Sequence, residues 1–461
     1  MLISKFNNLK FMKYKFLLPI ISMISIILYF VISKGASLKT FWIGGFFALF
    51  IQFLLEKDKK NFGKKCVSIL KNDTLLSCTL IFILAGILSS IFKSVGISDS
   101  LLLLCSQMGF DARFLPMVIF TICCIFSTAC GTSTGTITMA VPIFLPLSVS
   151  LGCNPALILG AIAAGSFFGD NLSPISDTTI ISVNTMKSDL YTTIKKRAKI
   201  SLIAFLISSL IYMLLGSIFI ETGTINLTFE GSYTALIFLI VPIFMFIFLA
   251  KTKDVISTLI FSNILAIGMA LVFNFITFSE LFSKSSVVIQ GIESVFGVIA
   301  FWIFLFIVIG CIPKDFFERI ANKSTQNPKK VLKNNLCGVL TIISSILLVS
   351  NNTAAMSMMS CVVDKFFKNK SKIDKANIFD GLSCAVPGML PYNTAFMLMI
   401  SLAFDSGCLA ENFSILEIPL FSINSMCLLV IYTYIALKKE PNHELLTAKN
   451  DCSILAREEN I

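Results

Sequence analysis

The chain has 461 residues, of which 56% are hydrophobic and only 14% are charged. Soluble domains carry about 25% charged residues, so this composition excludes an ordinary soluble protein. The net charge of +11 comes from basic residues in short loops between apolar stretches. Because these residues are not gathered on one face or in one domain, the charge does not indicate a nucleic-acid-binding protein.

Apolar stretches of about 20 residues, the length that spans a bilayer, recur along the whole chain. After a basic segment at residues 1–15, regular spans are predicted at 16–33, 38–55, 76–93 and 200–220, and again at 233–250, 255–278, 295–312 and 418–437. Residues 114–187 and 331–404 contain apolar helix interrupted by Gly, Pro, Asn and Thr. Period-two alternation is missing, which argues against a β-barrel. We expect an all-α polytopic membrane protein with about ten transmembrane helices, whose first span is not a cleaved signal.

A shift of 217 residues superposes the two sets of spans. It also places "STGTITMA" from Ser133 on "SNNTAAMS" from Ser350, and Pro174 on Pro391. One offset that orders every element predicts an internal repeat. The predicted repeats are residues 16–220 and 233–437, joined by an extracytoplasmic linker at 221–232 and followed by a tail at 438–461.

Lysine-rich loops are expected in the cytoplasm. Both ends of residues 334–364 lie beside such loops, so this stretch is predicted to enter and return as a re-entrant hairpin, and 117–147 is its counterpart from the other side. Residues 155–187 and 376–404 then cross once each as broken helices. Five crossings per repeat force the second repeat to be inverted, with both termini in the cytoplasm.

Four polar stretches fall at membrane depth, where non-helical backbone survives only if it is buried in protein or lines a wet cavity. "CGTSTGTITM" (130–139) and "VSNNTAAM" (349–356) are the predicted hairpin tips, and "NLSPISDTT" (171–179) and "GMLPYNTAF" (388–396) are the predicted breaks. Their hydroxyl, amide and carbonyl oxygens suit a hard cation such as Na⁺. The candidate tip ligands are Ser133, Thr134, Thr136, Asn351, Asn352 and Thr353, and those of the breaks are Asn171, Ser173, Thr178, Tyr392, Asn393 and Thr394. The neutral residues could instead only bond the broken backbone.

Asp170 and Asp177 are the most informative residues, because a charge at the bilayer centre costs about 2.5–3.5 kcal/mol or more. A carboxylate that binds either Na⁺ or H⁺ provides the simplest antiport chemistry, so we predict a Na⁺ site at this pair. The alternative for Asp177 is structural, since Ser176 and Asp177 can open the second half-helix. For Asp380, nearer the cytoplasmic end, structural and functional interpretations stay open. The single histidine, His443, lies in the tail, and the 14 cysteines show no metal-site spacing, so no cofactor is expected.

The first-half motif resembles the NhaC-type Na⁺/H⁺ antiporter family of the ion transporter superfamily. The matching residues are Gly165, Gly169, Asp170, Ser173, Pro174, Asp177, Thr178 and Thr179. In the second half, Pro391, Tyr392 and Asn393 resemble the family's Pro-aromatic-Asn break, but only Asp380 stands where many members carry an acidic pair. The resemblance implies an inverted-repeat fold with paired hairpins, a homodimer and an elevator-like movement.

The leading hypothesis is a secondary Na⁺/H⁺ antiporter of the bacterial cell membrane that uses Na⁺, H⁺ and the bilayer as its partners. No P-loop motif is present, so ATP-driven pumping is not expected. The runner-up is Na⁺-coupled symport or exchange of a small carboxylate or amino acid, since half-helix N-termini at the midplane suit a carboxylate. An intramembrane aspartyl protease is disfavoured because both aspartates fall in one segment. A passive channel is disfavoured by the repeat.

Overall fold

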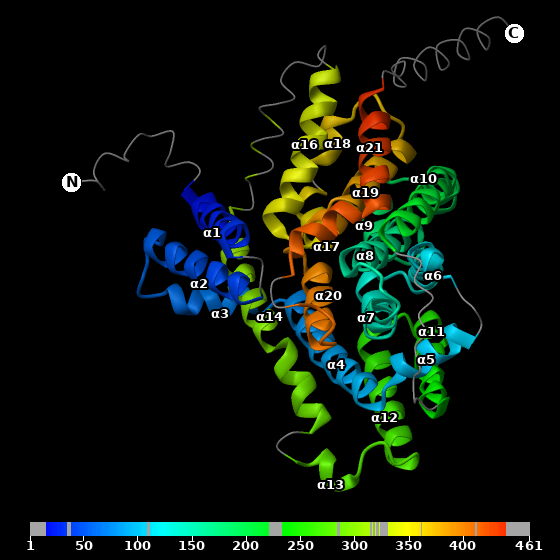
Figure 1. The fold of residues 1–461 in the computed structure, drawn as a ribbon. Helices are drawn as coiled ribbons and strands as arrows, with labels where there is room; N and C mark the ends of the chain where they lie inside the picture. The colour runs from blue at the N-terminus through cyan, green and yellow to red at the C-terminus, as the bar shows by residue number, and fades with distance from the viewer. Residues whose placement is uncertain are drawn as a thin grey trace, which may run out of the picture.

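The computed structural model describes residues 15–34, 38–107, 111–220, 233–283, 286–313, 331–360, 362–410 and 413–438, together with 316, 319 and 322. Within these ranges the chain forms helices and no strand (Figure 1). The first half contains η3 (Lys15–Leu17), α1 (Leu18–Lys34), α2 (Leu38–Leu55), α3 (Phe62–Leu70), α4 (Asp73–Val95), α5 (Ile97–Gln107), η4 (Ala112–Phe114), α6 (Leu115–Cys130), α7 (Ser133–Ser150), α8 (Pro155–Leu172), α9 (Asp177–Met186) and α10 (Leu190–Phe219). The second half contains η5 (Tyr233–Leu239), α11 (Ile240–Thr252), α12 (Val255–Val272), α13 (Phe278–Leu281), α14 (Val287–Gly310), α16 (Val331–Val349), α17 (Asn352–Met359), α18 (Val363–Phe366), α19 (Lys372–Ala385), η6 (Pro387–Met389), α20 (Thr394–Asp405), η7 (Ile415–Phe421) and α21 (Ile423–Leu437).

Ten helical segments of the described chain are long and apolar enough to cross a membrane, which confirms the polytopic all-α fold. These ten segments are not the same ten as those predicted from the sequence. They include α6, α7 and α16, which are arms of the predicted hairpins, whereas α1 and α2 have shorter apolar stretches and η7–α21 is a pair bent by 57°. The span predicted at 200–220 in fact starts ten residues earlier, because Asp189 caps α10 by accepting from Thr192 N–H.

The helix starts follow the predicted repeat. Helices α12, α19 and α20 each begin 217 residues after α2, α8 and α9, respectively. The hairpin tips are an exception. Thr132 and Asn351 are the equivalent N-caps, with Gly131 and Ser350 before them in the left-handed conformation. The two tips are therefore related by 219 residues, so the predicted superposition of Ser133 on Ser350 is two residues out of register.

Both predicted hairpins enter the bundle and return. In α8, Gly165 packs against Phe120 and Cys123 of α6, and Gly169 packs against Ser127 of the same helix. Residue numbers rise together along this contact, so α6 and α8 run parallel and α7 must bring the chain back between them. In the second hairpin, Gly338 near the start of α16 packs against Phe366 and Phe367 at the end of α18.

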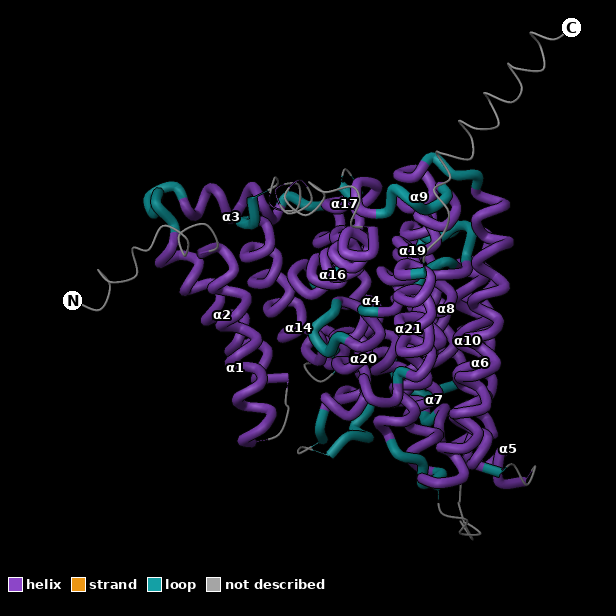
Figure 2. Tube along the Cα trace, turned by 90° about the horizontal axis from the view of Figure 1, so that it is seen from above, coloured by secondary structure: helices purple, strands orange, loops and turns teal. Residues whose placement is uncertain are grey.

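The equivalent helices α10 and α21 run antiparallel, as an inverted repeat requires. Ser208 Oγ lies 3.4 Å from Asn424 Oδ1, and one turn later the Tyr212 hydroxyl donates to the Phe421 carbonyl at 2.7 Å. Contacts between the halves are exchanged in the same way: α2 packs on α14 as α12 packs on α4, and α9 packs on α17 as α20 packs on α7. Helices α1 and α2 lie at one edge of the bundle, with α6 and α10 at the other (Figures 1 and 2).

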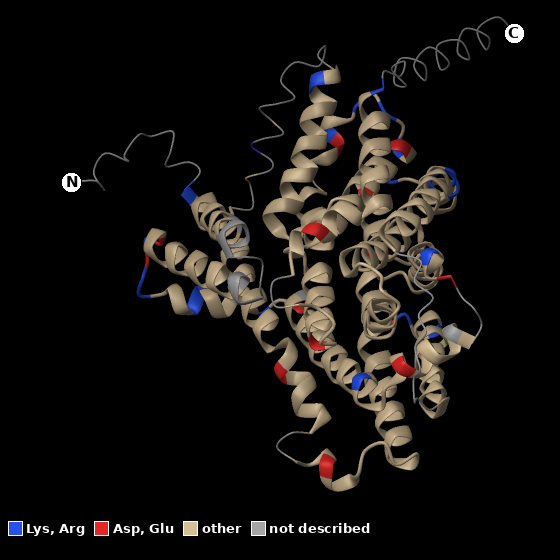
Figure 3. Ribbon diagram, viewed as in Figure 1, with Lys and Arg blue, Asp and Glu red and all other residues tan. Residues whose placement is uncertain are grey.

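The two broken helices form the centre of the bundle. In 18-residue apolar stretches of the spans Pro155–Met186 and Lys372–Asp405, 94% and 89% of the residues are buried, whereas the share in Leu190–Phe219 is only 22%. Side chains of α10 such as Leu206 and Leu210 face outward, so this helix covers the broken pair from the lipid side. Basic residues mark the upper ends of α16 and α21, and an acidic residue marks α13 at the lower end (Figure 3).

Candidate functional site

The first break separates α8 from α9 at the predicted position. Ser173 is extended, with φ −68° and ψ 132°, because the following Pro174 disfavours the helical conformation in the residue before it. Ser176 is the N-cap of α9, and Asp177 takes the first helical position and is exposed. A carboxylate there interacts favourably with the helix dipole, which agrees with the structural interpretation of Asp177. Asn154 caps α8 before Pro155, as its side chain accepts from Ala156 and Leu157 N–H.

The first hairpin tip packs directly on this break. Asp170 lies in the last turn of α8 with only 5% of its surface exposed, and its Oδ1 accepts from the backbone N–H of Ser133 at 2.9 Å. Gly131 takes φ +70°, and a side-chain carbon at this position would lie 2.7 Å from Ile175 and 3.1 Å from Ser173 Oγ. The glycine is thus required both by the backbone and by the close approach of the two segments.

The second break is closed by the second tip. The Ser350 carbonyl accepts from Asn393 Nδ2 at 2.9 Å and from Thr394 N–H at 3.2 Å, and the Ser350 hydroxyl donates to the Tyr392 carbonyl. Asn351 Nδ2 lies 3.3 Å from Thr394 Oγ1. These contacts supply hydrogen-bond partners to backbone groups that the interrupted helix leaves unpaired. They agree with the structural alternative for Asn351 and Asn393, in which the side-chain amides bond the broken backbone.

The two breaks meet through α9 and α19. Thr179 Oγ1 lies 3.4 Å from Asp380 Oδ2, and Thr178 Oγ1 lies 3.5 Å from Cys384 Sγ. Thr178 also donates to the carbonyl of Asp170 at 3.2 Å. The hydroxyls of the first motif therefore connect Asp170 with the second repeat.

Asp380 is fully buried and forms an ion pair with Arg197 of α10, which is also fully buried. Arg197 Nη1 donates to the Asn171 carbonyl at 2.7 Å and to Thr179 Oγ1 at 2.8 Å, while its Nε donates to Asn377 Oδ1 at 2.8 Å. A buried carboxylate with such a partner is neutralised. This contact favours the structural interpretation of Asp380.

Several predicted residues lie near these contacts without a ligand-like arrangement of their own. Thr136 donates to the Thr132 carbonyl of its own helix, and the Asn171 side chain accepts from Ser201 and from Tyr432. The side chains of Thr134, Asn352 and Thr353 are half-buried. No group of three or more His, Cys, Asp or Glu in the described residues could hold a metal ion. A cation here would thus depend on hydroxyl and carbonyl oxygens besides Asp170.

The sequence reasoning missed Arg197, Asn377, Cys384 and Tyr432. A signal for Arg197 existed, because only four of the 37 basic residues are arginine. Its periodicity was a second signal: the buried residues of α10 form one face, Thr193, Arg197, Ser201, Ala204, Ser208, Tyr212 and Gly216. Small and polar residues at helical spacing between leucines and isoleucines indicate a face turned toward protein.

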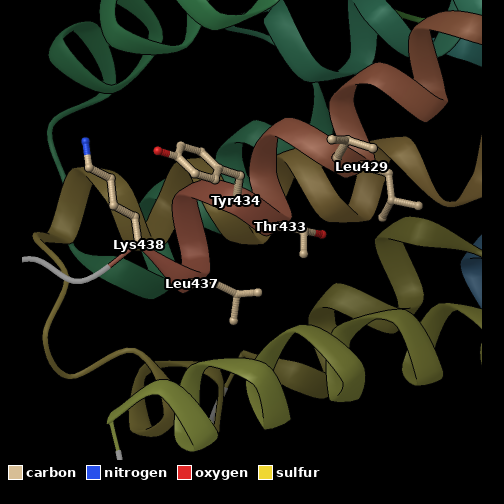
Figure 4. Close-up of a pocket in the computed structure, with 6 residues that line it drawn as sticks. Leu429, Thr433, Tyr434, Leu437 and Lys438 are labelled. Carbon is tan, nitrogen blue, oxygen red and sulfur yellow. The ribbon is translucent and has the colours of Figure 1, made fainter.

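The pocket in Figure 4 lies elsewhere, on α21. It has a volume of about 460 Å³ and is lined by Leu429, Val430, Thr433, Tyr434, Leu437 and Lys438. Val430 and Tyr434 are 68% and 65% exposed. This groove is therefore on the outer surface and is separate from the Asp170 region.

Residues 2–217 match the model of the Na⁺/H⁺ antiporter family. The malate-2H(+)/Na(+)-lactate antiporter of Bacillus subtilis is 24% identical over 240 residues, which are 50% of this chain and 51% of that protein. The Na(+)/H(+) antiporter NhaC of Alkalihalophilus pseudofirmus is 28% identical over 138 residues, 30% of each protein. The chain thus spans about half the length of the first of these relatives and less of the second.

The structure of the YdaH transporter of Alcanivorax borkumensis aligns with 92% of this chain and 97% of its own, at 13% identity and a TM-score of 0.40. Similarity at that score supports no conclusion. The family match covers the Gly165–Thr179 motif and confirms the resemblance that this motif carries: residues 2–217, which hold the first hairpin and the first broken helix, match the model of the Na⁺/H⁺ antiporter family.

Proposed function

We propose that the protein is a secondary transporter that exchanges Na⁺ for H⁺ at Asp170. One observation carries the proposal. Of the two aspartates buried beside the breaks, Asp380 is paired with Arg197, whereas Asp170 forms no ion pair with any described lysine, arginine or histidine. A buried carboxylate without a fixed counter-charge needs a mobile one, and Na⁺ and H⁺ compete for that role.

The surroundings of Asp170 suit a small hard cation. Ser173 and Thr178 place hydroxyl oxygens along the same break, and Thr178 Oγ1 lies 3.2 Å from the Asp170 carbonyl. Asp177, exposed at the start of α9, provides a second carboxylate from which an ion reaches the break. The half-helix end and its unwound backbone then replace the water shell of the ion, as in other transporters with discontinuous helices.

The architecture supports alternating access. In our proposal, residues 16–220 and 233–437 are two inverted repeats around this midplane site, and they work as a homodimer in the cell membrane with both termini in the cytoplasm. The antiparallel α10 and α21, and the exchanged packing of the tips, support the inverted arrangement. Residues 1–14, 221–232 and 439–461, which hold most of the predicted terminal segments and the linker, lie outside the described residues.

A second candidate function is Na⁺-coupled exchange of a small carboxylate. Helices α17 and α20 both begin beside Ser350, with Asn351 and Asn393 as their N-caps. Helix N-termini attract anions, and the Bacillus relative is named as a malate and lactate antiporter. Under this alternative, Na⁺ occupies the Asp170 region and the carboxylate occupies the second tip.

Transport in liposomes separates the two functions. An inward Na⁺ gradient should move protons outward without any added solute, and internal pH reports this movement. Asp170→Asn should abolish it because the amide cannot exchange a proton. Asp73→Asn, which removes an exposed acid in the first turn of α4, is the matched control and should transport normally. Proton movement that requires added malate or lactate would reject simple antiport, and an active Asp170→Asn variant would reject Asp170 as the site.

A further inference from the structure

We infer that Arg197 is a positioning residue for the Asp170 site: it fixes the two ends of the broken helix to each other and to the second repeat. This inference rests on the proposed function. The hydrogen bonds and the ion pair of Arg197 lead to Asn171, Thr179, Asn377 and Asp380 and not to Asp170. Arg197 acts through the peptide carbonyl of Asn171, the next residue along the chain, and through the hydroxyl of Thr179 on the far side of the break.

Apart from Arg197, a hydrogen bond from Thr178 Oγ1 to the Asp170 carbonyl at 3.2 Å connects the two sides of the break. Helix α8 ends at Leu172 and α9 begins at Asp177, so no continuous helical hydrogen bonding sets the distance between them. Arg197 Nη1 donates to one acceptor on each side, at 2.7 and 2.8 Å. Its positive charge also lies where the last turn of α8 presents partial negative charge. The guanidinium thus adds two hydrogen bonds that connect the half-helices where a helical turn is missing.

The same side chain links the break to α19. Nε bonds Asn377 at 2.8 Å, and Asp380 forms the ion pair. Because Asp380 offsets the charge of Arg197, the guanidinium can lie close to a cation site without repelling the cation. The planar fork of arginine serves acceptors in several directions at fixed angles, whereas the ammonium group of lysine is a single point. Through Nη1 and Nε, Arg197 of α10 reaches α8, α9 and α19, and the single nitrogen of a lysine would not bond the same acceptors at the same angles.

Arg197 is held in place by the buried face of α10. Its neighbours on that face include Thr193, whose carbonyl accepts from Asn377 Nδ2 at 3.3 Å, and Ser201, which bonds the Asn171 side chain at 3.1 Å. Both neighbours contact the same residues as Arg197 does. The side chain therefore enters the junction from a helix that is itself fixed to both sides of it.

Kinetics test this inference in liposomes that contain equal amounts of folded protein. Outer-sphere groups that orient ligands typically affect ion affinity by about 10–100-fold. Arg197→Lys, which keeps the charge, should raise the apparent KM for Na⁺ about tenfold and should lower the maximal rate much less. Thr179→Val, which removes one acceptor of Arg197 without changing any charge, should shift KM in the same direction. Lys196→Gln, on the adjacent and exposed residue, is the matched control and should leave KM unchanged.

The outcomes are distinct. A purely structural role would lower the yield of folded protein but leave KM of the folded fraction at the wild-type value, and that result would overturn the inference. If Arg197→Lys yields no folded protein, Thr179→Val decides in the same way: a raised KM supports positioning, and an unchanged KM rejects it. If the wild-type protein moves no protons under a Na⁺ gradient, the proposed function itself fails, and the inference fails with it.

Discussion

The buried ion pair between Arg197 and Asp380 gives a quantitative prediction about stability. Both side chains are 0% exposed, so removing either one leaves the other charge buried without its partner. The cost of such a change is about 3–5 kcal/mol. We therefore expect Arg197→Gln and Asp380→Asn each to destabilise the protein strongly.

The loss of unfolding free energy in the double variant should be smaller than the sum of the losses in the two single variants. The double variant leaves no stranded charge and loses the three other hydrogen bonds of Arg197, to Asn171, Thr179 and Asn377. Each such bond contributes about 0.5–1.5 kcal/mol net. The double-mutant cycle should thus give a coupling energy of at least about 2 kcal/mol.

A neighbouring pair that links the same two helices, α10 and α19, provides the control. Lys196 lies 2.5 Å from Asp374, with side-chain exposures of 50% and 9%. A pair in contact with solvent is worth about 1 kcal/mol or less, so the cycle of Lys196→Gln and Asp374→Asn should show little coupling. Unfolding in mixed detergent micelles, followed by circular dichroism, measures both cycles. Equal coupling energies in the two cycles would refute the argument that burial sets the difference.

Three further predictions concern packing, the second break and pH. Gly169→Ala should cost about 1–3 kcal/mol of unfolding free energy, because the new methyl group would lie 2.2 Å from the Ser127 backbone; Gly268→Ala in α12, with nothing within 4 Å, is the control and should be neutral or stabilising in the same micelle assay. Asn393→Ala should lower the thermal midpoint, since it removes both the α20 cap and the bond to Ser350; a midpoint equal to that of the wild type would contradict this. The pKa of Glu56 is lowered from its ordinary value of 4.5 by a hydrogen bond from Lys65. Its stabilisation is present above that value and lost as pH falls below it, so Glu56→Gln should lower stability slightly at pH 7 and not at pH 3; a difference that grows in acid would be the wrong sign.

The sequence predicted the helices and the interruptions well, for physical reasons that are local. Long apolar runs must be helical in a bilayer because their backbone groups have no other partners. Pro174 and Pro391 each force an extended residue before them, and Gly131 permits a tip at which the chain reverses. These effects depend on a few neighbouring residues, so one sequence is enough to place them. The sequence comparison used one ungapped shift of 217 residues, which aligns identical residues such as Ser133 and Ser350. In the structure the equivalent residues are the N-caps Thr132 and Asn351, so the two-residue difference between the tips was missed.

The partner of Asp380 could not be placed in the same way. Arg197 stands in "KKRAK" beside three lysines, and the positive-inside rule assigns such a cluster to a cytoplasmic loop. Helix α10 in fact starts before this cluster, at Leu190, and of the four basic residues in the cluster it buries Arg197. Which one faces inward depends on how α10 rotates against α8, α19 and α21, which is a tertiary property. The cation-site residues, Asp170 included, stay a prediction.

The two halves of this protein share a helical plan but divide the chemistry unequally. At the first break, the tip donates one backbone N–H to Asp170, so the carboxylate keeps capacity for a mobile cation. At the second break, the Ser350 carbonyl takes the donors of Asn393 and Thr394, and the neutral groups satisfy one another. The acid of the second half, Asp380, is used as a counter-charge for Arg197. Under the proposed function, one repeat would hold the ion-exchanging carboxylate while the other repeat supplies the hydrogen-bonded surface against which that site is held.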